Sequence, residues 1–230
     1  MKILRYSPAL LISVLLFSIT PAYGNSRPRV TINFDKNWRF HLGDVADGQN
    51  SELDDSQWRS LSLPHDWSIE GDFSEKNPAT PGGGALPGGV GWYRKSFTLP
   101  ASANDKVVLV DFDGIYRNSE VWINGHYLGK RPYGYISFQY ELTPHVNYGA
   151  RKNVIAVRVD NSQQPNSRWY SGSGIYRNVW LTTIDKAHVD HWGTYITTPE
   201  VSAQSAKVEI KTSVRNDFEN DLPVDRKSVV

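Results

Sequence analysis

Sixteen residues from Asn166 to Leu181, NSRWYSGSGIYRNVWL, combine aromatic rings, two arginines, amides and glycines in a way that suits carbohydrate binding. The C–H faces of a sugar pack against aromatic rings, and its hydroxyls bind planar, multidentate donors such as guanidinium. The alternative is a junction between a loop and a strand, in which Trp and Tyr side chains fill a protein core. Composition alone leaves both interpretations open.

Two other patterns that could carry chemistry are weaker. PGGGALPGGVG is rich in glycine, but no Gly-Lys-Ser/Thr follows it, so we expect a loop rather than a phosphate site. His188 and His191 are three residues apart in a segment with strand character. That spacing places them on opposite faces of a strand, which argues against a shared metal ion. We predict no metal site.

The first 24 residues have the organisation of a secretory signal peptide. Lys2 and Arg5 precede an apolar run over residues 9–19, and the small residues Ala22 and Gly24 follow it. The alternative is a membrane anchor, but the run is too short to span a bilayer. We therefore expect export to the periplasm or the cell exterior, with no membrane contact after cleavage.

Charge and cysteine content exclude several classes. The formal net charge is +1, and loss of Lys2 and Arg5 with the leader would make it −1. Such a balance does not indicate nucleic acid or an anionic membrane as a partner. The chain has no cysteine, so an exported form has no disulfides and depends on its hydrophobic core. Nothing in the sequence indicates a cofactor in this chain.

Short β-branched and aromatic runs bounded by turn residues predict strands throughout. These runs are VTINF, WYRKSFTL, KVVLVDF, SEVWIN, HYLGK, FQYEL, NVIAVRVD, RNVWLTTI and KVEIKTSV. Asn124-Gly125 has the composition of a type I′ hairpin turn. The pattern predicts an all-β fold, a sandwich or jelly roll. Five tryptophans in or beside these runs are expected to fill its core: Trp38, Trp58, Trp92, Trp122 and Trp180.

A domain boundary is expected near residue 187. Residues 25–187 would form the first sandwich, and residues 188–230 would begin a second one that is incomplete. HVDHWGTYITTP and AKVEIKTSVRN read as two strands, and two strands cannot make a core alone. We therefore expect the chain to be the front part of a longer polypeptide.

Five motifs in order carry a resemblance to a known family. They are FDKNWRFHLGD, DDSQWRSLSLPHDWSIEG, the glycine-rich loop leading into GWYRKSFTLP, FDGIYRNSEVWINGHYLGKRPYGYISFQYELT and SRWYSGSGIYRNVWL. Together they resemble the amino-terminal sugar-binding domain of glycoside hydrolase family 2, and the LPHDW and SRWYSGSGIYRNV variants are most similar to secreted bacterial β-galactosidases. The resemblance implies a galactose-binding-like jelly roll followed by an immunoglobulin-like sandwich.

The resemblance also implies a catalytic (β/α)8 barrel with two glutamates, one as acid/base and one as nucleophile. A barrel alone needs roughly 250 residues. The acid/base of the family follows an Asn, and no Asn in this chain precedes a Glu. We expect no catalytic residue here and no turnover by the chain alone.

Four residues are predicted to contact substrate. Asp66 in LPHDW matches a position where family members use Asn or Asp to hold the sugar; its alternative role is to cap a turn through backbone N–H groups. Asn166 and Arg168 lie where other members carry an Asp that binds the sugar and a sodium ion, so Arg168 could replace that ion. Their alternative is a surface loop paired with acids of another domain. Trp169 flanks them.

The resemblance implies hydrolysis of a terminal β-galactoside or related oligosaccharide, with the barrel in the missing part of the same polypeptide. The alternative is a stand-alone carbohydrate-binding module. Glucuronide or mannoside specificity stays open, and the sequence does not determine the oligomeric state.

Overall fold

The computed structural model describes residues 28–167 and 169–224. The predicted signal peptide (1–24) and Arg168 lie outside the described residues. In chain order the elements are β1 (Arg29–Asn33), β2 (Trp38–Leu42), β3 (Arg59–Leu61), η1 (Pro81–Gly83), β4 (Gly89–Phe97), η2 (Ala101–Ala103), β5 (Val107–Phe112), β6 (Ser119–Ile123), β7 (His126–Arg131), β8 (Phe138–Glu141), η3 (Thr143–His145), β9 (Asn153–Asn161), β10 (Val179–Ile184), β11 (Ala187–Val201) and β12 (Ala206–Asn216). Each η is a single 3₁₀ turn.

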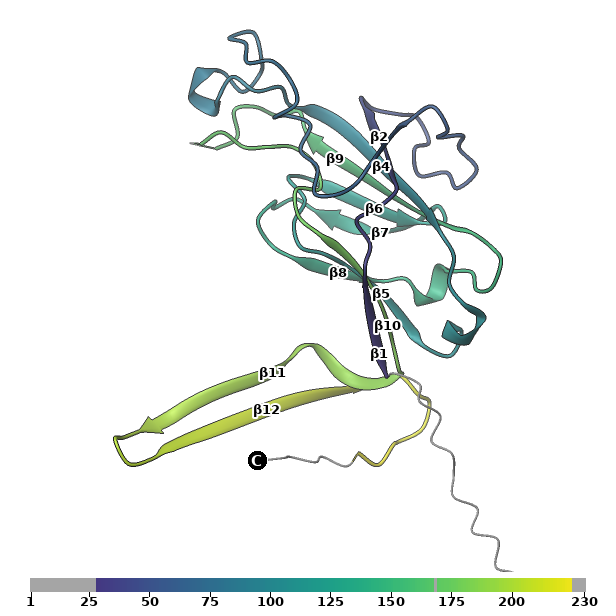
Figure 1. Cartoon of the computed structure of the whole chain (residues 1–230), viewed down its shortest axis with the longest axis vertical. Helices are drawn as coiled ribbons and strands as arrows, with labels where there is room; N and C mark the ends of the chain where they lie inside the picture. Colours follow the sequence, from purple (N-terminus) through teal and green to yellow (C-terminus); the bar gives the residue numbers. More distant parts are fainter. Residues whose placement is uncertain (1–27, 168, 225–230) are drawn as a thin grey trace, which may run out of the picture.

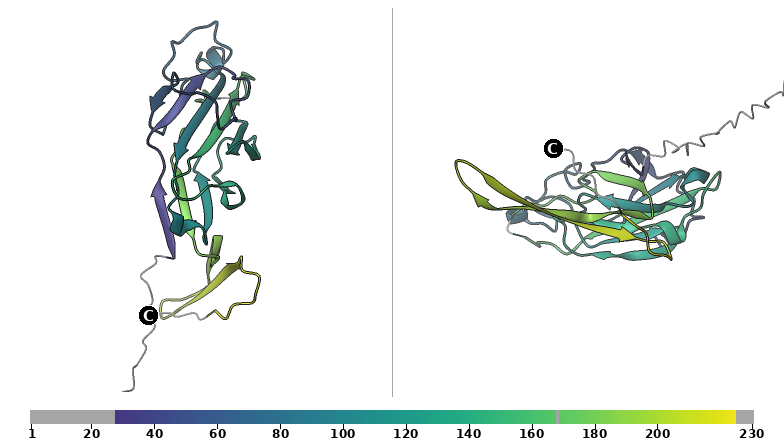
Figure 2. Two further views of the ribbon diagram at one scale, coloured as in Figure 1. Left: turned by 90° about the vertical axis from the view of Figure 1, so that its right-hand side faces the viewer. Right: turned by 90° about the horizontal axis from the view of Figure 1, so that it is seen from below.

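Two antiparallel sheets form a sandwich, which confirms the predicted fold class (Figure 1). One sheet has the order β1-β10-β5-β8, and the other has the order β3-β2-β4-β9-β6-β7. β11 and β12 pair only with each other and extend from the end of the sandwich where β10 finishes (Figures 1 and 2). β10 ends at Ile184 and β11 begins at Ala187. The division of the chain at residues 187 and 188 stays a prediction.

Period-two alternation decides which side chains form the core. Tyr93 on β4 is fully buried between the sheets, together with Val157 on β9 and Val121 on β6. Their chain neighbours point to the opposite face of the same sheet. The core therefore forms from alternate residues of strands that lie far apart in the sequence.

The alternation corrects the expectation that all five tryptophans fill the core. Trp38 is fully buried there, and its indole N–H donates to the carbonyl of Phe34 at 2.9 Å. Trp92 is also buried, at 3% exposed, but it neighbours Tyr93 and therefore packs on the outer face of the sheet, where it stacks on Trp122 with ring centroids 5.4 Å apart. Three of the five remain partly exposed: Trp122, Trp180 on the outer face of the four-stranded sheet, and Trp58 before β3.

The predicted hairpin turn between β6 and β7 is confirmed. Asn124 and Gly125 both have positive φ, 49° and 81°, as a type I′ turn requires. The Asn124 side chain also accepts a hydrogen bond from the N–H of Val154 on β9 at 2.8 Å. This contact fastens the hairpin to the next strand of the sheet.

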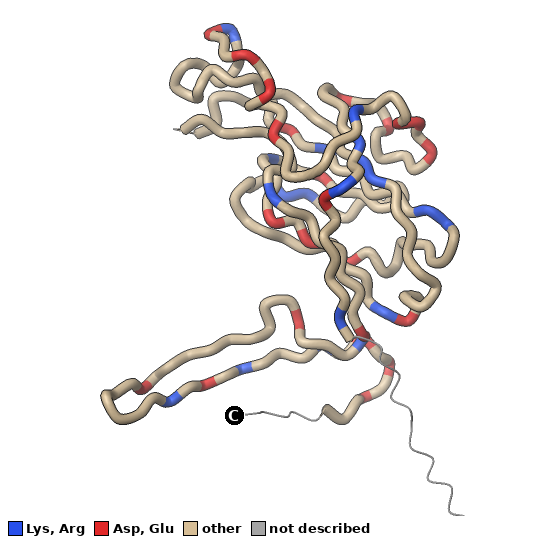
Figure 3. Tube along the Cα trace, viewed as in Figure 1, with Lys and Arg blue, Asp and Glu red and all other residues tan. Residues whose placement is uncertain are grey.

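Lysines and arginines and the acids of both kinds are distributed along the whole trace of the sandwich (Figure 3). Within residues 28–167 and 169–224, no helix is long and apolar enough to cross a membrane.

The difference between inner and outer tryptophans can be measured. Trp38→Ala should lower the free energy of unfolding by about 3–5 kcal/mol, because it leaves a cavity in a close-packed core. Trp122→Ala is the matched control and should cost clearly less, since its ring is partly exposed. Chemical denaturation followed by circular dichroism gives both values. Equal losses would contradict the assignment of the two faces.

Candidate functional site

The LPHDW and SGSGI segments lie side by side at one edge of the sandwich. The N–H of His65 donates to the carbonyl of Ile175 at 2.9 Å, and the N–H of Trp67 donates to the carbonyl of Ser173 at 3.0 Å. Residues 63–68 and 171–175 are called the Asp66 junction below. Two motifs that are about a hundred residues apart in the chain therefore form one structure.

Asp66 occupies the centre of this junction and is half-buried. One carboxylate oxygen, Oδ1, accepts hydrogen bonds from the N–H groups of Ser68 at 2.9 Å and Ser173 at 2.8 Å. In the described part of the chain, no hydrogen bond reaches the other oxygen, Oδ2. Asp66 thus makes the turn-capping contacts of the alternative interpretation through Oδ1, while Oδ2 lies against Gly172.

Glycines make the close approach of the two segments possible. A Cβ at Gly172 would overlap Oδ2 of Asp66. Gly174 has a φ of +129°, and a Cβ there would overlap the hydroxyl of Tyr93 and lie 2.7 Å from the carbonyl oxygen of His65. A side chain at either position would push the segments apart.

Asn166 joins the junction through a chain of amides. Buried Asn161 donates to Oγ of Ser173 at 2.7 Å and accepts from Nδ2 of Asn166 at 2.7 Å. Asn166 also donates to the carbonyl of Gln163, and its Oδ1 accepts from the hydroxyl of Tyr116, both at 2.9 Å. Both amide hydrogens of Asn166 are therefore used inside the protein, and only its Oδ1 can accept a further bond.

Of the other two residues predicted to contact substrate, the structure describes only Trp169. Arg168 lies outside the described residues. The side chain of Trp169 is 76% exposed, and its backbone is held by Ser167. Tyr170, which follows, is 70% exposed. The loop therefore presents two aromatic rings to solvent, on the chain segment that also fixes Asn166.

A cluster of polar and charged side chains that the sequence analysis missed contacts the Asp66 junction through His65. His65 is buried, with Nδ1 at 2.7 Å from the hydroxyl of Tyr93 and Nε2 at 3.3 Å from Oε2 of Glu70. Arg59 binds Glu70 through two hydrogen bonds of 2.6 and 2.8 Å. These partners come from β3, β4 and the loop between them. No local spacing in the sequence connects them.

The pKa values of this cluster follow from burial and pairing. The hydrogen bonds from Arg59, more than the contact with His65, lower the pKa of Glu70 to about 2. Burial lowers the pKa of His65, against the opposing effect of Glu70, and raises the pKa of Tyr93. At neutral pH, Glu70 is thus ionised and His65 is neutral. The cluster fixes the backbone of LPHDW. Among the described residues, no group of three or more His, Cys, Asp or Glu side chains is placed to hold a metal ion.

Comparison with known proteins decides the family. Residues 32–185 match the family described as glycosyl hydrolases family 2, sugar binding domain, a range that includes the whole Asp66 junction. The chain belongs to glycoside hydrolase family 2. The part of the family that it matches is the sugar-binding domain. The order of the five motifs predicted this family, which composition alone did not.

Related family-2 proteins are much longer than this chain. A β-galactosidase of Bacteroides ovatus, BoGH2A, is 54% identical over 194 residues, which are 84% of this chain and 23% of that protein. A putative β-glucuronidase of Formosa agariphila is 43% identical over 85% of this chain and 19% of its own length. The crystal structure of a β-glycosidase from Bacteroides vulgatus has 48% identity and a TM-score of 0.79, covering 83% of this chain and 25% of that one. The chain spans between 19% and 25% of the length of these relatives.

The glycine contacts of this family-2 domain predict a specific loss of stability. Gly174→Ala should lower the free energy of unfolding by about 1–3 kcal/mol more than Gly89→Ala, because only position 174 is overpacked. Gly89 is the matched control, since its φ is +101° and nothing lies within 4 Å of an added Cβ. Chemical denaturation measures both variants. Similar losses would show that backbone strain alone matters.

The Glu70 pair predicts a dependence of stability on acid. Its folded pKa of about 2 lies below the ordinary value of 4.5, so its stabilising contribution is present above pH 4.5 and is lost as the pH falls toward 2. Glu70→Gln should therefore flatten the fall of the thermal unfolding midpoint over that range. Glu75→Gln is the control, because Glu75 is exposed and forms no ion pair with a described residue. A fall as steep in Glu70→Gln as in the unaltered chain would contradict the role of Glu70.

Proposed function

We propose that this family-2 domain holds the terminal sugar of a β-galactoside for a catalytic barrel on further sequence of the same polypeptide. The observation that carries the proposal is the free oxygen of Asp66, which the junction fixes beside an exposed aromatic loop. A fixed carboxylate oxygen accepts hydrogen bonds from sugar hydroxyls, and exposed rings cover the C–H faces of a sugar.

The relatives support a complete hydrolase over a stand-alone binding module. Each of the relatives described above aligns with this chain over less than a third of its own length. Retaining hydrolysis needs two carboxyl groups about 5 Å apart, flanking the glycosidic bond. The proposed role of this chain is to orient the sugar, with Asp66 as acceptor and Trp169 and Arg168 as further contacts.

A neutral galactoside fits the junction better than a glucuronide. Asp66 and Glu70 are both acids of the same loop, and Arg59 keeps Glu70 ionised. Arg59 compensates the charge of Glu70, so a uronic acid would meet the carboxylate of Asp66 as the uncompensated like charge of the described junction, which is unfavourable. The more similar of the two curated relatives described above is named a β-galactosidase, and the other a putative β-glucuronidase. We also infer export of the protein, because residues 1–24 have the pattern of a signal peptide.

The role of Asp66 can be tested in the polypeptide that joins this chain to its barrel. Asp66→Asn keeps Oδ1 as acceptor for the N–H groups of Ser68 and Ser173, but it replaces Oδ2 by an amide donor. We expect an unchanged unfolding midpoint and a KM for nitrophenyl β-galactoside raised about tenfold to a hundredfold, because a charged hydrogen bond contributes about 1.5–3 kcal/mol.

Asp54→Asn is the matched control. Oδ1 of Asp54 accepts from the N–H of Ser56 at 2.9 Å in the same kind of turn. Asp54 is exposed and does not belong to the Asp66 junction. It should leave KM unchanged. A normal KM in Asp66→Asn would restrict Asp66 to its structural contacts, and faster turnover of nitrophenyl β-glucuronide than of the galactoside would overturn the proposed substrate.

A further inference from the structure

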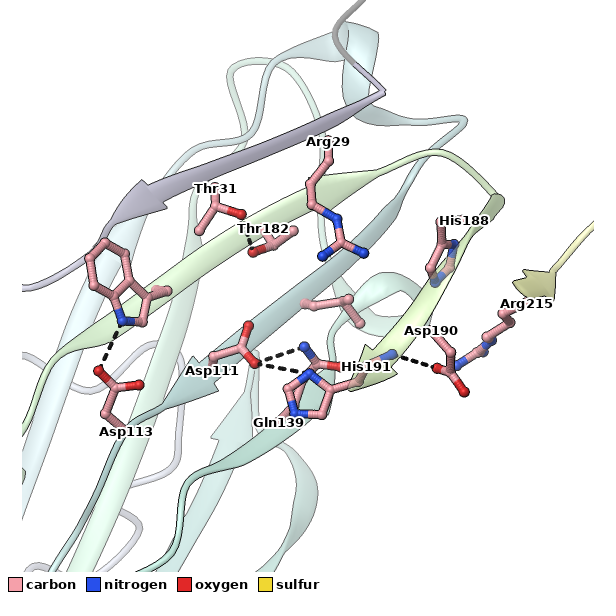
Figure 4. A pocket seen from close by; sticks show the side chains of 12 residues that line it. Arg29, Thr31, Asp111, Asp113, Gln139, Thr182, His188, Asp190, His191 and Arg215 are labelled. Carbon is pink, nitrogen blue, oxygen red and sulfur yellow. Dashed lines mark hydrogen bonds and ion pairs between the residues drawn. The ribbon is translucent and has the colours of Figure 1, made fainter. Parts of the chain in front are cut away.

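A polar pocket of about 450 Å³ lies on the outer face of the four-stranded sheet, beneath the start of β11 (Figure 4). Its volume falls within the range of about 300–1,000 Å³ that is usual for small-molecule sites. None of the residues that line it belongs to the Asp66 junction. The lining combines residues of the sandwich with residues of the β11–β12 hairpin.

The floor of the pocket is built by cross-strand rows of the sheet. Trp180, Asp111 and Gln139 are direct neighbours on β10, β5 and β8. Nε2 of Gln139 donates to Oδ1 of Asp111 at 2.8 Å, and the indole of Trp180 donates to Asp113 at 3.0 Å. Leu109 adds an apolar patch to this row of polar groups. The floor therefore offers carbon surface and oriented hydrogen-bonding groups together.

The roof comes from β11 and corrects an expectation from the sequence. His188 and His191 both line the pocket, although their spacing predicted opposite faces of a strand. The register with β12 shifts between Val189 and Thr194, and a bulge of this kind changes the side to which later residues point. His191 consequently lies over the floor, with Nδ1 3.8 Å from Oδ1 of Asp111.

Two arginines hold the roof in place. Arg29 on β1 donates to the carbonyl of Val189 at 2.8 Å, and Arg215 on β12 pairs with Glu141 on β8 at 3.1 Å. Figure 4 shows both guanidinium groups beside the pocket. The sandwich and the hairpin thus enclose the pocket jointly through polar contacts.

The charges of the lining select the chemistry of a ligand. The lining has three carboxylates (Asp111, Asp113 and Asp190), two guanidinium groups (Arg29 and Arg215) and two imidazoles (His188 and His191). A charged ligand would meet groups of both signs here, whereas a hydroxyl group can donate to a carboxylate and accept from a cation at the same time. Oδ2 of Asp111 receives no hydrogen bond from the residues described. Burial raises the pKa of Asp111.

We propose that this pocket is a second carbohydrate site, which binds one neutral sugar unit between the sheet and β11. Asp111 accepts from the sugar hydroxyls, and Leu109 and the ring of Trp180 contact its C–H face. His191 closes the site from above. This inference goes beyond the function proposed for the Asp66 junction, because it depends on different residues.

The test follows the indole N–H signal of Trp180 in nitrogen–proton NMR spectra of the full chain, titrated with galactose and with lactose. We expect a saturable shift. Asp111→Ala and His191→Ala should each weaken binding at least tenfold. His191 lies on the roof, so its replacement leaves the sandwich core intact. Asp105→Ala is the matched control, as an exposed acid just before β5, and should bind normally.

The outcomes separate this site from the Asp66 junction. A shift that persists in Asp66→Ala and disappears in both pocket variants, with their unfolding midpoints preserved, supports the second site. No shift at about 10 mM of either sugar overturns it, since a weak ~1 mM site would then be nearly saturated. A shift that Asp66→Ala abolishes and His191→Ala leaves unchanged also overturns it, while the function proposed for Asp66 stands.

Discussion

The close approach of residues 63–68 and 171–175 is the constraint on which the proposed site depends. The hydrogen bond from the N–H of Ser173 to Asp66 joins positions 107 residues apart, and it forms only because Gly172 has no side chain to collide with the carboxylate. β10 begins a few residues later at Val179. The junction therefore fixes both the oxygen that we propose to bind a sugar and the entry of a central strand into its sheet.

Alternation along the strands gives each sheet a second, outward use. Tyr93 contributes to the core between the sheets, and the neighbouring Trp92 packs against Trp122 on the outer face of the same sheet. On the other sheet, the outward row of Trp180 and Asp111 becomes the floor of a pocket once β11 folds over it. The outer faces of both sheets thus carry packed side chains and are not covered by solvent alone.

Electrostatic contacts in this fold mainly fix loops. Arg59 and Glu70 anchor one end of LPHDW, and the buried pair of His65 and Tyr93 anchors its middle. Exposed ion pairs contribute little to stability by themselves. Their contribution here is positional, because each removes freedom from a loop that carries Asp66.

The sequence by itself predicted the strands apart from β2 and β3, the Asn124-Gly125 turn and the family, since these depend on local alternation, turn residues and the order of motifs. It also singled out Asp66, whose contact with substrate stays a prediction. Only the tertiary structure decided that both amide hydrogens of Asn166 bind groups of the protein. It also decided that Trp180 faces outward and that His188 and His191 line the same pocket. These features depend on a bulge and on contacts between segments far apart in the chain. Local patterns do not encode such contacts, because a residue's spacing fixes its direction only while its strand stays regular.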